Sequence, residues 1–96
     1  MTIYALASGS GISGVAVIRV SGDNVKRVIK LLTGKELPSP RVATLRKINN
    51  INTSELIDEG IIIWFPGPES YTGEDMAEIH IHGGKAVIQA LLNTIS

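Results

Sequence analysis

The chain of 96 residues contains no cysteine, so neither a disulfide framework nor a thiolate metal site can form. No apolar run approaches the length of a membrane-spanning helix, and the N-terminus lacks the basic and apolar pattern of a secretory leader. Nine basic and nine acidic residues cancel, so the overall charge predicts neither a nucleic-acid partner nor a membrane. We therefore expect one small cytoplasmic domain.

The charges are nevertheless distributed unevenly along the chain. Eight of the nine basic residues lie between Arg19 and Lys47, whereas seven of the nine acidic residues lie between Glu55 and Glu78. Such a separation can orient a charged partner, but solvated surfaces produce the same pattern more often. We interpret the two clusters as solvated faces.

The sequence signatures of nucleotide and nucleophilic chemistry are missing. The chain has no G-K-[ST] phosphate loop and no serine paired with a plausible base at motif spacing. Gly9, Gly11 and Gly14 match the G-x-G-x-x-G dinucleotide pattern. However, V-A-V-I-R-V follows, which is typical of a strand rather than of the helix that holds a pyrophosphate. We predict a glycine-rich hairpin loop and no catalytic residue.

Hydrophobic periodicity predicts an α+β fold, a two-layer domain in which about five antiparallel or mixed strands pack against two helices. The expected strands cover residues 3–7, 15–20, 41–48, 58–65 and 76–82, and the expected helices cover 24–33 and 84–95. Ser21 and Asp23 offer capping side chains for the first helix, and Gly34 is suited to end it. The fourth strand is apolar on both faces at its centre, which favours a position inside the sheet.

Residues 64–84, W-F-P-G-P-E-S-Y-T-G-E-D-M-A-E-I-H-I-H-G-G, are the most informative stretch. A polar turn separates two strands, and successive side chains of the second strand point to opposite faces. The apolar residues of that strand share one face: Ala77, Ile79 and Ile81. The polar residues share the other face: Glu78, His80 and His82. One face is therefore suited to a core, and the other to chemistry, a partner or water.

Two interpretations of these polar residues remain open. Imidazole and carboxylate groups suit zinc or iron, so Glu78, His80 and His82 could ligate a metal, but no further ligand is evident and a structural or partner-facing strand is favoured. Arg19 interrupts an apolar strand and either points into water or is presented to an anionic ligand.

Three segments carry a resemblance to a known family: V-I-R-V-S-G at 17–22, W-F-P-G-P-E-S-Y-T-G-E-D at 64–75, and E-I-H-I-H-G-G at 78–84. They resemble the N-terminal domain of the bacterial tRNA-modification GTPases of the MnmE (TrmE) family, and the similarity runs through almost the whole chain. The resemblance implies a fold related to the folate-binding aminomethyltransferases. It also implies a homodimer that binds a 5-formyl-tetrahydrofolate-type one-carbon donor at the dimer interface.

In that family the complete enzyme adds a helical domain, a GTPase domain that uses GTP with magnesium and potassium ions, and a C-terminal cysteine motif. With the flavoprotein MnmG (GidA) it modifies C5 of the wobble uridine of certain tRNAs, leading to a carboxymethylaminomethyl group. The resemblance therefore implies that residues 1–96 form an N-terminal tetrahydrofolate-binding and dimerisation domain, cut from a GTP-hydrolysing enzyme and without GTPase machinery of its own.

The family's folate contacts fall on Arg19, from its R-[IV/L]-S-G motif, and on Glu78, the last residue of E-D-x-x-E. A lysine that also contacts folate in the family belongs to a later segment. The chain departs from the family at residues 9–13, which replace P-P-G-[RK]-[GA], and at Lys85, where proline is common. The pterin edge suits a carboxylate and the glutamate tail of folate suits a guanidinium, but which end each residue meets stays open.

An alternative of a different class is a non-enzymatic oligomerisation module that has lost folate binding, because the first loop diverges and the chain is short. The two hypotheses differ in whether the parent gene continues into a G-x-x-x-x-G-K-[ST] motif and a C-terminal cysteine motif.

Overall fold

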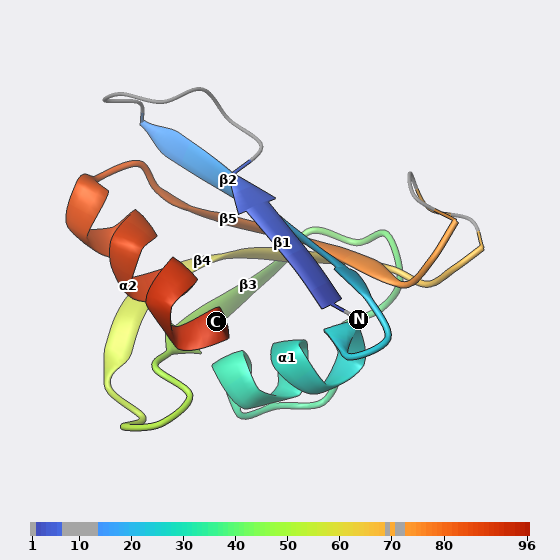
Figure 1. Cartoon of the computed structure of the whole chain (residues 1–96), viewed down its shortest axis with the longest axis horizontal. Coiled ribbons are helices and arrows are strands. Elements are labelled where there is room, and N and C mark those ends of the chain that lie inside the picture. Colours follow the sequence, from blue (N-terminus) through green and yellow to red (C-terminus); the bar gives the residue numbers. More distant parts are fainter. Residues whose placement is uncertain (1, 7–13, 69, 71–72) are drawn as a thin grey trace.

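The computed structural model describes residues 2–6, 14–68, 70 and 73–96, which form a five-stranded sheet and two helices (Figure 1). The elements in chain order are β1 Thr2–Leu6, β2 Val15–Gly22, α1 Val25–Thr33, β3 Thr44–Asn49, β4 Leu56–Phe65, β5 Met76–His82 and α2 Lys85–Ile95. The strand order is β1-β2-β5-β4-β3, and every neighbouring pair is antiparallel. The predicted α+β architecture is confirmed.

Both helices pack against the same face of the sheet (Figure 1). The buried core lies between these two layers and is formed by Ala16, Ile18, Val20, Val25, Ile29, Leu32, Ile48, Ile62, Trp64, Ala77, Ile79, Ile81 and Leu91. The predicted core face of β5 is therefore confirmed. In the described part of the chain no helix covers the opposite face, which we call the open face.

The two ends of α1 differ from each other in how well the sequence predicted them. Strand β2 continues through Gly22, and the helix begins after Asn24, whose side chain makes no capping hydrogen bond. The N-cap position is therefore held by Asn24 rather than by Ser21 or Asp23, the residues that the sequence offered for capping. At the other end Gly34 has a left-handed conformation with φ 67°, and its N–H donates to the carbonyl of Lys30 at 2.8 Å. This glycine cap is the predicted one.

Strand β3 begins three residues later than expected. Arg41 has a positive φ of 61°, which is incompatible with a regular strand. The backbone is instead held at Trp64, where Pro40 forms an isolated bridge and the N–H of Arg41 donates to the Trp64 carbonyl at 2.8 Å. Regular pairing with β4 starts only at Thr44.

Strand β4 lies between β5 and β3, as its apolar centre predicted. It follows the expected turn, in which the side-chain oxygen of Asn50 accepts hydrogen bonds from the N–H groups of Asn52 and Thr53. The strand passes very close to β5 at Gly60, where an added Cβ would lie 2.1 Å from the carbonyl oxygen of His80. Only glycine fits this position without a backbone shift.

The glycine-rich segment falls mainly outside the described residues, which include Gly14 but neither Gly9 nor Gly11. The residues after Gly14 form strand β2, so the helix required by a dinucleotide fold is not there. Within the described segments, no helix combines the length and the apolar character needed to span a membrane.

Candidate ligand site on the open face

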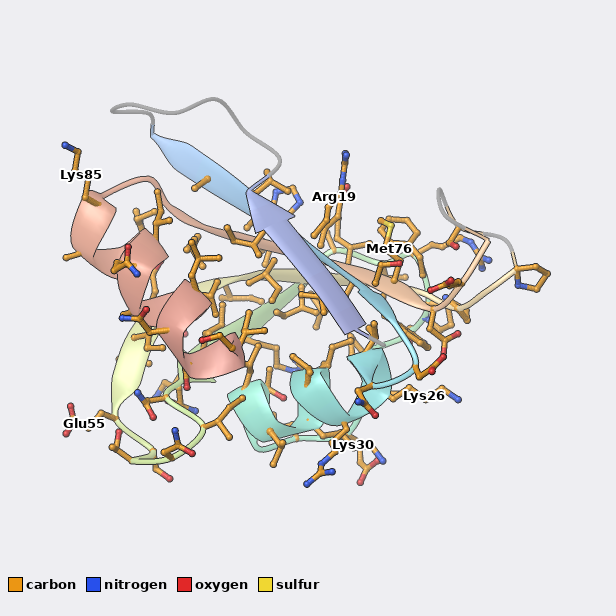
Figure 2. All side chains as sticks on the ribbon, viewed as in Figure 1. Arg19, Lys26, Lys30, Glu55, Met76 and Lys85 are labelled. Atoms are coloured by element: carbon orange, nitrogen blue, oxygen red, sulfur yellow. The ribbon has the colours of Figure 1, made fainter. Side chains whose placement is uncertain are left out.

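The register of the sheet places the predicted site residues side by side on the open face. Strand β2 pairs with β5 so that Arg19 lies opposite Glu78, although the two residues are 59 positions apart in sequence. Strand β4 pairs with β5 on the other side and places Ile63 opposite Glu78. Arg19 extends away from the helices (Figure 2). Neither β2 nor β5 is an edge strand, so the polar pair stands near the middle of the sheet.

Glu78 is the centre of a short polar network. The Nε–H of Arg19 donates to Oε2 of Glu78 at 3.0 Å, and Nε2 of His80 lies 3.1 Å from Oε1 of the same carboxylate. The Glu78 side chain is only 11% exposed, whereas that of Arg19 is 49% exposed. The carboxylate is thus held in place on both oxygens, while the guanidinium reaches into solvent.

The network keeps Glu78 ionised. Burial of its carboxyl group by itself raises the pKa, but the hydrogen bonds from His80 and Arg19 and the charge of Arg19 outweigh burial and hold the pKa of Glu78 below its usual value. Glu78 is therefore a carboxylate at neutral pH and is unsuited to act as a general acid there. It can accept hydrogen bonds or balance a positive charge.

A second imidazole–carboxylate pair lies at the end of β5. Asp58 of β4 accepts a hydrogen bond from the backbone N–H of His82 at 2.9 Å, and both of its carboxylate oxygens lie 2.9 Å from Nδ1 of the ring. Burial raises the pKa of Asp58, but the hydrogen bonds from His82, the backbone hydrogen bond at Glu59 and the charge of His82 outweigh burial and lower the pKa overall. Sequence reasoning missed Asp58, because nothing in the local pattern indicates a partner 24 positions away.

These contacts bear on the alternative that Glu78, His80 and His82 ligate a metal ion. His80 pairs with Glu78, and His82 pairs with Asp58, so the two imidazoles have different carboxylate partners. Among the described residues no group of three such side chains is arranged to hold a metal ion. The polar face of β5 is thus organised as two separate hydrogen-bonded pairs.

A shallow hollow of about 260 Å³ lies beside His80 on the open face. Its lining residues combine apolar groups with two histidines and one glutamate: Val15, Leu45, Glu59, Gly60, Ile61, His80, Ile81 and His82. The hollow is continuous with the Arg19–Glu78 pair through His80, which contacts Glu78 and lines the hollow.

Comparison with known proteins identifies the family of this chain. The family model described as "GTP-binding protein TrmE N-terminus" matches residues 2–96. The "tRNA modification GTPase MnmE" of Pelagibacter ubique is 76% identical over 96 residues, covering 100% of this chain and 22% of the relative. The zebrafish (Danio rerio) "5-taurinomethyluridine-[tRNA] synthase subunit GTPB3, mitochondrial" is 53% identical over 94 residues, covering 98% of this chain and 19% of the relative.

A third relative, the "tRNA modification GTPase MnmE" of Maricaulis maris, is 51% identical over 94 residues, covering 98% of this chain and 21% of that protein. The chain thus spans about one fifth of the length of these relatives. Because the family model covers all but the first residue, the chain belongs to the family of TrmE N-terminal domains.

Proposed function

We propose that this chain is the N-terminal tetrahydrofolate-binding and dimerisation domain of a tRNA-modification GTPase. The names of the relatives support the tRNA-modification role of the parent protein. The observation that carries the folate proposal is the Arg19–Glu78 pair, held at 3.0 Å in the middle of a sheet face that no helix of the described chain covers. These are the two residues on which the family's folate contacts fall.

The Arg19–Glu78 pair presents one positive and one negative group to a bound folate. A carboxylate has about four lone-pair sites, so Glu78 can accept pterin N–H bonds while it keeps its bonds to Arg19 and His80. The guanidinium of Arg19 is a planar fork of N–H donors, and its side chain is 49% exposed, so it can meet a ligand carboxylate or carbonyl from the solvent side. Val17 and Ile63 are half-buried neighbours and offer apolar contact to the rings.

In this proposal the domain positions a one-carbon donor and leaves GTP hydrolysis to another part of the parent. The chain has no phosphate loop for GTP and its magnesium ion. The parent acts in the cytoplasm with the flavoprotein MnmG on C5 of the wobble uridine of tRNA. Donor positioning needs no acid–base dyad on this chain, which is consistent with an ionised Glu78.

Dimerisation is proposed through the open face and its rim. Large apolar side chains remain accessible there, since Val15 is 54% exposed and Leu45 is 58% exposed. A second copy of the domain would cover this surface and enclose a ligand lying on Arg19 and Glu78. Sedimentation velocity at about 100 μM tests this point, with a dimer as the expected species and a persistent monomer as the contradicting result.

The folate proposal is tested by calorimetry on the full-length parent. Loss of a hydrogen bond to a charged group costs about 1.5–3 kcal/mol, so Arg19→Ala and Glu78→Ala should each weaken binding of 5-formyl-tetrahydrofolate about ten- to a hundredfold. Lys85→Ala removes a charge at the start of α2, far from Arg19 (Figure 2), and should leave affinity unchanged. Unchanged binding by both site variants would contradict the assignment. Dimers that bind no folate would favour the oligomerisation module.

A further inference from the structure

A second hollow, of about 360 Å³, lies where the end of α1 meets the edge strand β3. Six of its seven lining residues are polar or charged in type: Thr33, Lys35, Leu45, Arg46, Lys47, Asn49 and Glu59. It borders the open-face hollow at Leu45 and Glu59 but contains neither Arg19 nor Glu78. Three of its seven lining residues are cations, and one is an anion. The folate proposal assigns no role to these cations.

Two different elements bring the three cationic residues to the hollow. The left-handed Gly34 turns the chain at the end of α1, and the next N–H, that of Lys35, donates to Oγ1 of Thr33 at 3.2 Å. On the edge strand β3, the side chains of Arg46 and Lys47 lie on opposite faces of the sheet, so the two residues border the hollow from either side of the strand edge. Nη1 of Arg46 donates to the carbonyl of Leu45 at 3.1 Å. The hollow is therefore formed by the helix end and the strand edge together.

The positive charge of this hollow is poorly compensated. In the described part of the chain, Lys35, Arg46 and Lys47 form no salt bridge. The Nε of Arg46 is a buried nitrogen without a hydrogen-bond partner there. A buried donor without a partner is costly, and an anion that enters the hollow can relieve the charge. Glu59 is the only acidic lining residue and opposes such binding.

The basic surface continues from the hollow along α1. Lys26 and Lys30 are separated by one helical turn, so they share a side of the helix, and both extend away from the sheet (Figure 2). Lys30 has a partner, since its Nζ lies 3.5 Å from Oε2 of the exposed Glu36. Lys26 and Arg27 are exposed and form no salt bridge among the described residues. The exposed cations Lys26, Arg27 and Lys30 thus extend the basic surface along α1, and we call these three residues the strip.

We propose that the α1–β3 hollow and this strip bind the phosphate backbone of RNA, and specifically of the tRNA substrate. The identification of the RNA rests on the proposed function of the parent, whereas the preference for phosphate rests on the charges and hydrogen-bond donors of the hollow. The four lysines and two arginines of the hollow and the strip are suited to successive phosphates and carry no base specificity. The zero net charge of the chain conceals this segregation of cations on one surface.

The test is fluorescence anisotropy with an unmodified tRNA transcript and the 96-residue chain at several salt concentrations. The double variant Lys35→Gln/Lys47→Gln should bind about tenfold more weakly, and the slope of log K against log[salt] should fall by about 2, because each phosphate contact contributes about 0.9. Lys85→Gln is the control for loss of an exposed lysine at a remote site, and it should change affinity less than twofold. Glu59→Gln should tighten binding about two- to threefold.

The outcomes are distinct for the two proposals. Equal losses from the double variant and from Lys85→Gln, or no tRNA binding even at low salt, would overturn the RNA surface. Far-ultraviolet circular dichroism and the urea midpoint of the double variant should match the parent chain, because the replaced side chains are exposed. Binding of 5-formyl-tetrahydrofolate by the same variant in the full-length protein should be unchanged. Failure of folate binding with an intact tRNA response would contradict the folate assignment and leave the RNA surface supported.

Discussion

The two faces of the sheet use the same strands for different purposes. The sheet residues packed beneath α1 and α2 include Ile18, Ile62 and Ile79, which are apolar and all 0% exposed. The open face, one residue out of phase, alternates charged groups with half-buried apolar groups. Its central members are Arg19 and Glu78. The strand period of two thus separates a stabilising surface from one that is available to a ligand.

This difference explains why polar residues can occupy the middle of the sheet. The helices already supply the apolar burial that holds the domain together, so the opposite face does not have to be apolar. Glu78 remains a nearly buried carboxylate because Arg19 and His80 satisfy both of its oxygens. Removing one of these partners would leave a buried charge under-compensated, which restricts the residues that fit there.

The largest expected effect is the difference in stability between truncating a side chain on the core face and truncating its neighbour on the open face. Ile62 and Ile63 are neighbours on β4 that point to opposite sides, and only Ile62 belongs to the core. Ile62→Ala should lower the free energy of unfolding by about 2–5 kcal/mol, and Ile63→Ala by about 1 kcal/mol. Urea denaturation of both variants measures the difference. Equal losses would mean that the open face also contributes to the stabilising core.

A smaller effect is expected at the Asp58–His82 pair. Asp58→Asn removes a charge-assisted bond to an exposed ring, which should cost about 1 kcal/mol of unfolding free energy at pH 7. The folded pKa of Asp58 lies below its ordinary value of 3.8, so its contribution is present above that pH and is lost as the pH falls through the folded pKa.

Stability of the native sequence should therefore fall more steeply below pH 4 than that of the Asp58→Asn variant. Thermal unfolding followed by circular dichroism across this pH range provides the comparison. Parallel curves for the two proteins would show that Asp58 makes no pH-linked contribution, and would contradict the lowered pKa.

The smallest effect is expected at the Lys30–Glu36 pair. The two charged atoms are 3.5 Å apart, but the side chains are 49% and 90% exposed, so solvent screens the pair. Glu36→Ala should change the free energy of unfolding by less than about 0.5 kcal/mol in urea denaturation. A loss comparable to that of Ile62→Ala would contradict the view that burial, rather than surface charge, stabilises the domain.

The sequence predicted which segments form strands and helices better than it predicted which segments lie side by side. Alternation in 76–82 gave the strand β5 and its two faces, because one face is buried under helices. It could not reveal that β5 lies between β2 and β4, since that order depends on pairing between distant segments. The bond between Asp58 and His82 and the convergence of Lys35 with Lys47 both depend on this long-range arrangement.

Local conformation set another limit on prediction. The left-handed Gly34 was predictable, because glycine favours that conformation at a helix end. Arg41 adopts a similar φ without being glycine, and its contact with Trp64 delays the start of β3. The pairing of Arg19 with Glu78 came from the register, whereas their proposed ligand came from the family resemblance.

The most direct test of the central claim, that the open face binds a tetrahydrofolate at Arg19 and Glu78, is a titration of the isotope-labelled chain followed by two-dimensional NMR. With 5-formyl-tetrahydrofolate, the account predicts that the largest shifts occur at backbone amides of β2 and β5 around Arg19, Glu78 and His80. Amides of α1 and α2 should change little, because the helices lie on the opposite side of the sheet. Shifts concentrated on the helices, or no shifts in a chain that is folded, would contradict the claim.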